Sequence, residues 1–366
     1  MADTSVSYKC PNCSAPLPFQ PGADKAVCEY CGTEFEVSVL EELYRQEEER
    51  AAQAAAEQEA KWDTEAVGGE WTEEEAAMLR VFTCSSCGAE LVCDENTMAT
   101  ECCYCGNPTL LPNRFDGMLK PDYIIPFKKT KQEAVAALKE FYKGKLLLPS
   151  AFTAGNRVEA IQPMYVPFWL FDSDVEAHAT FRASKDHRYE TSDEIITETK
   201  VYECIRGGTM DFELIPVDGS EKMQDDYMDS IEPFDYDELV PFQATYLAGN
   251  LADKYDVTAE DSAERADSRV RNSAIGVLDS SVRGYDRREL QDSAVIKREG
   301  HVQYAMLPVW ILTTRYEGKP FTFMMNGQTG KVVGSLPIDK MKSYLYPTIF
   351  TAILVPLIFI LIQALM

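Results

Sequence analysis

Residues 84–105 read CSSCGAELVCDENTMATECCYC, and residues 10–31 read CPNCSAPLPFQPGADKAVCEYC. Each stretch holds two Cys-x-x-Cys pairs with fourteen residues between them, and the later stretch repeats the earlier one 74 positions on (84 against 10). Two residues between thiolates let one tight turn present both sulfurs to a single ion, and two such turns complete a tetrahedral sulfur site, which suits zinc. The pattern therefore predicts two zinc ribbons with one zinc ion each. The eight predicted ligands are Cys10, Cys13, Cys28, Cys31, Cys84, Cys87, Cys102 and Cys105.

The repeat extends beyond the cysteines. Leu17 and Leu91 coincide at the same offset, as do Tyr30 and Tyr104. A glycine follows the second cysteine of three turns, and we expect a positive φ at each, because glycine adopts that conformation without a steric penalty. These glycines are Gly32, Gly88 and Gly106.

Structural disulfides in a secreted protein are the alternative explanation of the cysteine pairs. The N-terminal residues MADTSVSYKC contain no apolar signal-peptide region. Cys93, Cys103 and Cys204 fall outside the pattern and would be unpaired in an oxidising compartment. Zinc in a reducing cytosol is therefore favoured, although Cys93 and Cys103 lie within the second ribbon and could replace a ligand there.

The charge of the chain bears on its partners. The 366 residues carry a formal net charge of −25 and are 45% hydrophobic, which is enough for two or three domains. Residues 41–76 hold thirteen acidic and three basic residues, and residues 211–264 hold sixteen acidic and two basic ones. Proteins that bind nucleic acid neutralise phosphates with clusters of Lys and Arg. The composition thus disfavours nucleic acid as a partner and indicates that the ribbons dock protein or have a structural role.

Helical segments are indicated by composition and periodicity. Residues 38–62 are rich in Ala, Glu and Gln and predict a solvated helix that acts as a semi-rigid spacer or, alternatively, as a weak partner helix. Thr72 and Glu75 have the spacing of a capping box. Further helices are predicted at 131–143, 219–231 and 258–283.

Strands are expected in the second half of the chain. The segments 165–170 and 306–311 share an apolar-Pro-apolar-Trp-apolar core, which suggests an internal duplication. Other strands are predicted at 177–183, 195–205, 321–325 and 331–334. Asn326-Gly327 predicts a tight turn between the last two strands. Residues 327–331, GQTGK, lack the full spacing of a phosphate loop and no helix is predicted after them, so we interpret them as a hairpin.

The C-terminal residues 344–366, YLYPTIFTAILVPLIFILIQALM, contain no charged residue. At 1.5 Å per residue they reach about 34 Å as a helix, enough to cross the hydrocarbon core of a bilayer. Lys331, Lys340 and Lys342 precede them and place that side in the cytoplasm by the positive-inside rule. The alternative is a buried core helix. The run predicts a single-pass C-terminal anchor in the cell membrane, with the bulk of the chain in the cytoplasm.

No catalytic constellation is evident, and we predict that the protein is not an enzyme. The sequence has three histidines and no zincin motif, nucleophile elbow or complete phosphate loop. His178 and His187 flank a possible hairpin and could meet across strands, although surface positions are favoured for both. Cys204, Trp169 and Trp310 lie in apolar strand patterns and are expected to be buried.

Together these features predict an α+β protein. Its expected parts are a zinc ribbon at 1–37, an acidic helical linker at 38–80, a second zinc ribbon at 81–112, a β-rich cytoplasmic body at 113–340 and a transmembrane helix at 344–366.

The chain resembles the bacterial TFIIB-type zinc-ribbon membrane proteins of the YdjG type. The resemblance rests on VFTCSSCGAELVCDENTMATECCYCGNP at 81–108, RFDGMLKPDYIIPFK at 114–128, YVPFWLFDSDVEA at 165–177 and LPVWILTTRYEGKPFTFMMNGQTGKVVG at 307–334, and it covers most of residues 81–334. The chain departs from the family pattern at Cys103, where proline is expected.

The resemblance implies a membrane partner of a phage-shock-type PspA protein in the envelope-stress response, with a second membrane protein as a further possible partner. The expected function is that of a membrane-anchored zinc-ribbon adaptor that recruits cytoplasmic proteins. Two alternatives stay open at this point. One is a nucleic-acid or transcription-associated ribbon module, and the other is a ligand-binding or enzymatic body.

Overall fold

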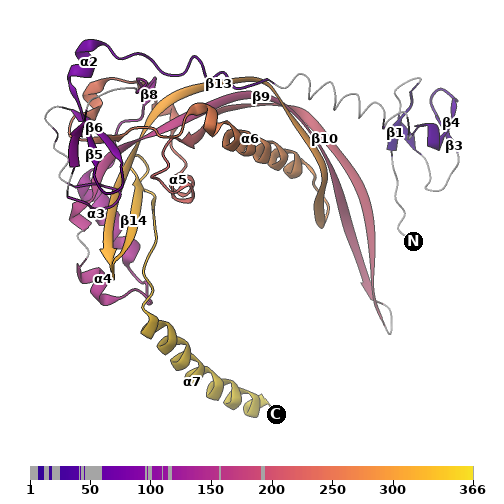
Figure 1. Cartoon of the computed structure of the whole chain (residues 1–366). Coiled ribbons are helices and arrows are strands. Elements are labelled where there is room, and N and C mark those ends of the chain that lie inside the picture. Colours follow the sequence, from indigo (N-terminus) through magenta and orange to yellow (C-terminus); the bar gives the residue numbers. More distant parts are fainter. Residues whose placement is uncertain are drawn as a thin grey trace. The chain divides into compact units, whose positions relative to one another are not determined.

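The computed structural model of the chain describes residues 7–11, 16–18, 25–40, 42, 45, 60–94, 97, 101–108, 110–113, 118–155, 158–190 and 194–365. The chain divides into two compact units. The first comprises Met1–Ala66, Leu170–Pro216 and Ala263–Val302, and the second comprises Val67–Trp169, Val217–Ser262 and Gln303–Met366. It is an α+β protein with a β-rich body, two cysteine clusters and one apolar C-terminal helix, as the sequence predicts (Figure 1).

Two short hairpins build the N-terminal part of the first unit. β1 (Ser7–Lys9) pairs antiparallel with β2 (Pro16–Pro18), and β3 (Lys25–Val27) pairs antiparallel with β4 (Glu34–Glu36). The small core of this part consists of Cys10, Leu17, Ala26, Cys28, Val37 and Leu40. We call residues 7–40 the N-terminal cysteine module. A helix begins at Val37, but most of the helix predicted at 38–62 lies outside the described residues, so its role as a spacer stays a prediction.

Three long strands dominate the middle of the chain: β9 (Gln162–Glu190), β10 (Ile195–Asp218) and β13 (Arg287–Tyr316). β9 pairs with both of the others (Figure 1). The segments predicted at 165–170 and 177–183 merge into β9. The burial pattern gives the reason, since a continuously buried run at 164–171 is followed by burial of every second residue up to Ala183. Such alternation is typical of a strand with one buried face, so strand pairing does not stop between the two segments.

Trp62 is a second packing centre in the first unit, apart from the N-terminal cysteine module. Its indole lies edge-on to Phe171, with 4.8 Å between ring centroids, and its Nε1 donates to Asp267 at 2.9 Å. The Lys297 ammonium lies 4.0 Å from the centre of the indole ring and also bonds Asp267 at 2.7 Å. A side chain at Gly300 would come within 2.8 Å of the indole, so this close packing requires glycine. The charged pair is thus stabilised by an aromatic surface on one side.

His178 and His187 both lie on β9 and are exposed, so the favoured prediction of surface positions is confirmed and the alternative that they meet across strands is wrong. His178 Nε2 lies 3.2 Å from Glu176 Oε1 on the same strand. A Cβ at Gly207 of β10 would approach the His178 ring to 2.5 Å, so the glycine makes room for the imidazole.

The sheet of the second unit begins with strands from the second cysteine repeat. β5 (Leu79–Cys84) pairs antiparallel with β6 (Glu90–Asp94) and with β7 (Leu110–Asn113). β6 also pairs with β12 (Leu251–Asp253), which in turn runs parallel to the start of β9. The second repeat is therefore a continuous part of the main sheet.

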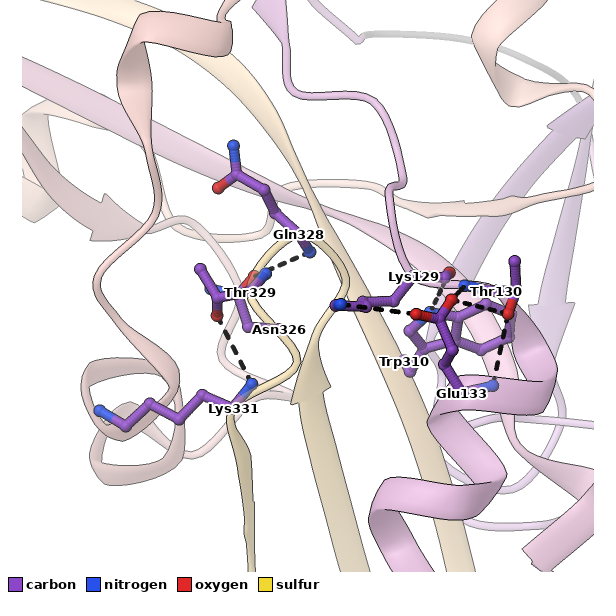
Figure 2. Close-up of polar contacts among 8 residues, drawn as sticks. All are labelled: Lys129, Thr130, Glu133, Trp310, Asn326, Gln328, Thr329 and Lys331. Carbon is purple, nitrogen blue, oxygen red and sulfur yellow. Dashed lines mark hydrogen bonds and ion pairs between the residues drawn. The ribbon is translucent and has the colours of Figure 1, made fainter.

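In the same sheet, on the opposite side of β9 from β12, β13 pairs with β8 (Tyr123–Ile124) and β14 (Lys319–Asn326). β8 also pairs with β11 (Val240–Pro241). β14 forms the predicted hairpin with β15 (Val332–Gly334), and its turn is held by Asn326, whose Oδ1 accepts from the backbone N–H groups of Gln328 and Thr329 at 2.9 Å each (Figure 2). The interpretation of residues 327–331 as a hairpin is confirmed.

Helix α3 (Lys131–Tyr142) covers this part of the sheet. It begins with a capping box between Thr130 and Glu133, and Trp310 on β13 donates its Nε1 to the Lys129 carbonyl at 3.0 Å (Figure 2). The apolar face of α3 packs on α4 (Ser150–Gly155), η1 (Val158–Ala160) and the strands. The buried members of this core are Ala134, Leu138, Tyr142, Leu148, Phe152, Val158, Ile161, Trp310, Leu312, Phe323 and Met325.

The other helices follow the sequence closely, with one exception. α2 (Glu73–Ala77) carries the capping box predicted for Thr72 and Glu75, and α6 (Ala259–Ser281) matches the helix predicted at 258–283. The helix predicted at 219–231 is shorter, since α5 spans Asp225–Ile231. The residues before it are bound elsewhere, because the Gly219 N–H donates to the Pro167 carbonyl and the Ser220 hydroxyl donates to Asp253. Short 3-10 helices follow at η2 (Tyr236–Glu238) and η3 (Ala244–Leu247).

The chain's last described helix is α7 (Lys340–Leu365). Its segment Lys340–Ile358 has a mean hydropathy of 1.3 and is not buried in the protein, so a buried core helix is not what the structure shows. Pro347 and Pro356 lie inside the helix. By length and composition α7 is able to span a membrane.

Candidate metal centres

The second cysteine cluster stands on two turns of the same geometry. In the first turn the Cys84 N–H donates to the Ala89 carbonyl and the Gly88 N–H donates to the Cys84 carbonyl, both at 2.9 Å. In the second turn the Cys102 N–H donates to the Asn107 carbonyl and the Gly106 N–H donates to the Cys102 carbonyl, both at 2.8 Å. Gly88 and Gly106 have φ of 74° and 69°, so the expectation of a positive φ is confirmed at both positions. These turns set the direction in which the thiols point.

The four sulfurs of this cluster converge. The ligand atoms of Cys84, Cys87, Cys102 and Cys105 all lie within 4.8 Å of one another. The Cys84–Cys105 and Cys87–Cys102 sulfur pairs are each 3.6 Å apart. Zinc–sulfur bonds of about 2.3 Å in a tetrahedron put neighbouring sulfurs about 3.8 Å apart, so the observed spacing fits a metal ion held by four thiolates.

Local hydrogen bonds favour charged sulfur in the cluster. The Cys103 thiol and the N–H groups of Cys105 and Tyr104 lower the pKa of Cys102 to about 4. Burial raises the pKa of Cys87, whose sulfur lies 3.6 Å from the Cys102 sulfur. The Ser86 N–H donates to Cys84 Sγ at 3.4 Å. A divalent cation placed among the four sulfurs would displace the remaining protons, as metal binding to thiols generally does.

The first cluster lies in the N-terminal cysteine module. The ligand atoms of Cys10, Cys28 and Cys31 lie within 4.8 Å of one another, and Cys10 and Cys31 are 3.6 Å apart at sulfur. The fourth predicted ligand, Cys13, lies outside the described residues. The turn at Cys28 repeats the geometry of the second cluster, with Cys28 bonded to the Thr33 carbonyl at 3.0 Å and a φ of 72° at Gly32.

Cys31 is the exposed member of the first cluster. Its sulfur lies 3.2 Å from the Thr33 hydroxyl, and this contact lowers the pKa of the Cys31 thiol to about 6. The first cluster therefore also holds a thiol that ionises readily, which favours a metal cation over three neutral thiols.

The remaining cysteines are not part of either cluster. Cys103 is buried, and its sulfur lies 3.4 Å from the Met164 sulfur. Cys93 is buried and donates to the Thr97 carbonyl at 3.3 Å. The suggestion that either could replace a ligand is not supported by these contacts. Cys204 is buried in β10, and Trp169 and Trp310 are buried in the core, as predicted.

Behind the second cluster is a buried polar group that the sequence gave no reason to expect. Asp253 on β12 accepts a hydrogen bond from the Ser220 hydroxyl at 2.6 Å, and the Tyr104 hydroxyl interacts with the same carboxyl group. Burial raises the pKa of Asp253 to about 7, and the nearby Asp256 adds to the shift. Tyr104 lies between two cysteines of the second turn, so this network connects the turn to the sheet.

A cavity of about 260 Å³ opens beside this network. Its charged side chains are paired, with Lys254 to Glu90 at 2.9 Å and Lys222 to Asp256 at 3.0 Å. Only the repeated tyrosine could have pointed to this network in the sequence, but its equivalent in the first repeat, Tyr30, is 78% exposed.

The comparisons with known proteins identify one family. No family model and no solved structure matches the chain. The chain is 35% identical over 337 residues to the Bacillus subtilis (strain 168) protein described as uncharacterized protein YdjG, and the match covers 92% of each protein. At this identity and coverage, the chain belongs to the YdjG family.

Proposed function

We propose that the protein is a membrane-anchored zinc-ribbon adaptor that recruits cytoplasmic proteins to the cell membrane. The observation that carries the proposal is the combination found within the second unit. Four converging cysteine sulfurs and a helix long and apolar enough to cross a bilayer belong to the same compact unit. A protein-docking module of this kind would be fixed to the membrane through its own fold.

The metal is proposed to be zinc, with one ion in each ribbon. An all-sulfur tetrahedral site suits zinc, and four protein ligands leave no open position for substrate or water. Such a closed site stabilises a fold and supplies no catalytic water. This supports a structural role for both metals, and the absence of enzyme activity is part of the same proposal.

The proposed partners are proteins. The net charge of −25 repels nucleic acid, whose binding depends on cationic side chains. The resemblance to the zinc-ribbon membrane proteins names a PspA-like phage-shock protein as the first partner to test, with a second membrane protein as a further candidate. In that setting the adaptor would act in the envelope-stress response. Lys340 and Lys342 at the start of α7 support a cytoplasmic body.

The proposal is tested by affinity capture of the full-length protein from detergent-solubilised membranes. The double variant Cys84→Ser and Cys87→Ser is expected to lose the PspA-like partner while it stays in the membrane fraction. Cys93→Ser is the matched control, because this cysteine lies in the same repeat but outside the sulfur cluster. Undiminished capture by the double variant would overturn the adaptor role of the ribbon. Salt-sensitive, submicromolar binding of DNA or RNA by the wild type would favour a nucleic-acid module instead.

The anchor is tested separately. Deletion of residues 344–366 is expected to release the protein into the soluble fraction, because these residues form the apolar part of α7. A truncated protein that still sediments with membranes after a high-salt wash would contradict anchoring by α7 alone.

A further inference from the structure

Apolar side chains are exposed around the start of α7. Leu146 and Leu147 follow α3, Ile338 precedes α7, and Met341 lies in its first turn; they are 68%, 39%, 65% and 82% exposed. We call these four residues the apolar collar. Three of them line a groove of about 650 Å³ together with α7 side chains that include Tyr346 and Phe350. A contiguous apolar patch of this kind is uncommon on the water-facing surface of a monomer and marks an interaction site.

The collar is held in place by the fold. The Asp339 N–H donates to the Leu147 carbonyl at 2.8 Å, and Lys342 Nζ donates to the Leu148 carbonyl at 2.7 Å. The next residue inward, Leu148, is itself part of the core under α3. The loop that presents Leu146 is therefore fixed on both sides, to the beginning of α7 and to the core.

The charge of the same region is opposite to that of the chain as a whole. Residues 128–145 contain six lysines and two glutamates, a net charge of +4 (six minus two), whereas the whole chain carries −25. Lys145 lies 5.5 Å from the Phe141 ring, and Lys143 forms an exposed pair with Glu140 at 3.2 Å. Lys340 lies at the start of α7. Lys145 directly precedes Leu146, and Lys340 directly precedes Met341, so each is next to a residue of the apolar collar in the chain.

We propose that this face is a membrane-docking surface, in which the apolar collar inserts at the boundary between headgroups and acyl chains of an anionic bilayer. Lys143, Lys145 and Lys340 contact the lipid phosphates, as basic residues beside buried apolar ones do in interfacial segments. Continuity with α7 and the local positive charge together select a lipid surface as the occupant. The inference rests on the proposed membrane span of α7, and it adds that the body itself lies on the bilayer.

Tryptophan quenching in reconstituted membranes tests the proposal. Full-length Leu146→Trp, Tyr346→Trp and Met78→Trp proteins are placed in nanodiscs of phosphatidylcholine and phosphatidylglycerol whose acyl chains are brominated near the headgroups. The wild-type signal from its four tryptophans is subtracted. Tyr346→Trp reports the span, and Met78→Trp is the matched control, because Met78 is 54% exposed and lies in the same unit at the end of α2. We expect the added emission of Leu146→Trp and Tyr346→Trp to fall about twofold, with little change for Met78→Trp.

The outcomes separate the two proposals. Quenching of Tyr346→Trp without quenching of Leu146→Trp beyond the Met78→Trp level overturns the docking surface and leaves the span in place. Absence of quenching at Tyr346→Trp overturns the span and the docking surface with it. The lysines are tested by adding Lys143→Gln, Lys145→Gln and Lys340→Gln to Leu146→Trp. In the lipid mixture, quenching of this variant should fall to the level that Leu146→Trp shows in phosphatidylcholine alone. Undiminished quenching of the variant in the mixture would show that the lysines have no part in docking.

Discussion

The two cysteine clusters share one sequence pattern and, at the described turn after Cys28, one turn geometry, but they lie in different surroundings. The N-terminal cysteine module has its own short strands, a core of six residues and an exposed Cys31. In the second cluster, β5 and β6 are strands of the main sheet, and Tyr104 is turned inward onto a buried carboxyl group. The same ligand spacing can therefore form the centre of a small module, as in the N-terminal cysteine module, or lie at the end of strands that a larger sheet already holds, as in the second cluster. A core as small as that of the module does not fold without a metal or a comparable crosslink.

The strongest test of this comparison replaces one ligand at equivalent positions of the two repeats, as Cys28→Ser and Cys102→Ser. Structural zinc contributes on the order of 10–16 kcal/mol of apparent binding free energy to small modules at neutral pH. We expect Cys28→Ser to unfold the module, seen as loss of amide-exchange protection in β3 and β4. In Cys102→Ser, β5 and β6 should keep their protection, because Leu79, Val81, Leu91 and Val92 stay buried in the sheet.

The two variants serve as controls for each other, since each leaves the other repeat intact. Equal loss of protection in both repeats would show that the sheet does not support the second cluster. Retained protection in Cys28→Ser would show that the module folds without its metal.

A second prediction concerns Asp253, a buried carboxyl for which the described part of the module has no counterpart in its core. The folded protein raises the pKa of Asp253 from 3.8 to about 7, so it holds this proton more tightly than the unfolded chain does. Stability should therefore fall as pH rises from about 4 to about 7. Asp253→Asn removes the charge and keeps an acceptor for Ser220. At 1.36 kcal/mol per pKa unit, we expect the variant to be about 2–4 kcal/mol more stable than the wild type at pH 8.

Thermal unfolding in detergent across this pH range measures the difference between the two proteins. The difference should disappear near pH 4, where the wild-type carboxyl group is protonated. A variant that is less stable than the wild type at every pH would mean that Ser220 and Tyr104 stabilise the carboxylate more than burial disfavours it.

A smaller effect is expected at the glycines of the turns. Gly32 and Gly106 have φ of 72° and 69°, and a Cβ at either position meets no atom closer than 4.0 Å. Alanine at each should therefore cost only the strain of the left-handed conformation, about 1–2 kcal/mol. We expect Gly32→Ala and Gly106→Ala to weaken zinc retention in their own repeats by similar factors, measured by competition with a chelator. A much larger loss in one repeat would show that the turns are not equivalent.

The smallest effect is expected for Cys103→Ala. The Cys103 sulfur lies beside the Met164 sulfur and outside the sulfur cluster, so the zinc content should not change. Elemental analysis of the purified protein should find two zinc ions per chain in the wild type and in the variant. A content of one in the variant alone would place Cys103 among the ligands.

Local features of the molecule could be predicted from the sequence. The ligand spacing, the positive φ of the glycines, the capping box of α2 and the hairpin at Asn326 each depend on a few neighbouring residues. The extent of the long strands could not be predicted, because β9 changes at Phe171 from continuous burial to alternate burial, and two of its pairing partners, β12 and β13, lie far away in the chain. The different fates of Tyr30 and Tyr104 depend on β12, which comes about 150 residues after the second repeat (253 against 104) and has no equivalent for the first. Asp253 looked like any other acidic residue in an acidic stretch for the same reason.

The hydrogen bonds from Asp339 and Lys342 to the Leu147 and Leu148 carbonyls connect the first turn of α7 to the protein interior. A transmembrane helix changes its tilt when the bilayer becomes thinner or thicker. In the proposed membrane span, a change in the tilt of α7 would pull on the core under α3, because the first turn of α7 is bonded to a loop whose Leu148 belongs to that core. We expect amide exchange at Leu148 and Phe152 to depend on the acyl-chain length of the surrounding lipid, and exchange rates that are the same in all bilayers would contradict this coupling. A change in bilayer thickness would then reach the core under α3 through the hydrogen bonds at the first turn of α7.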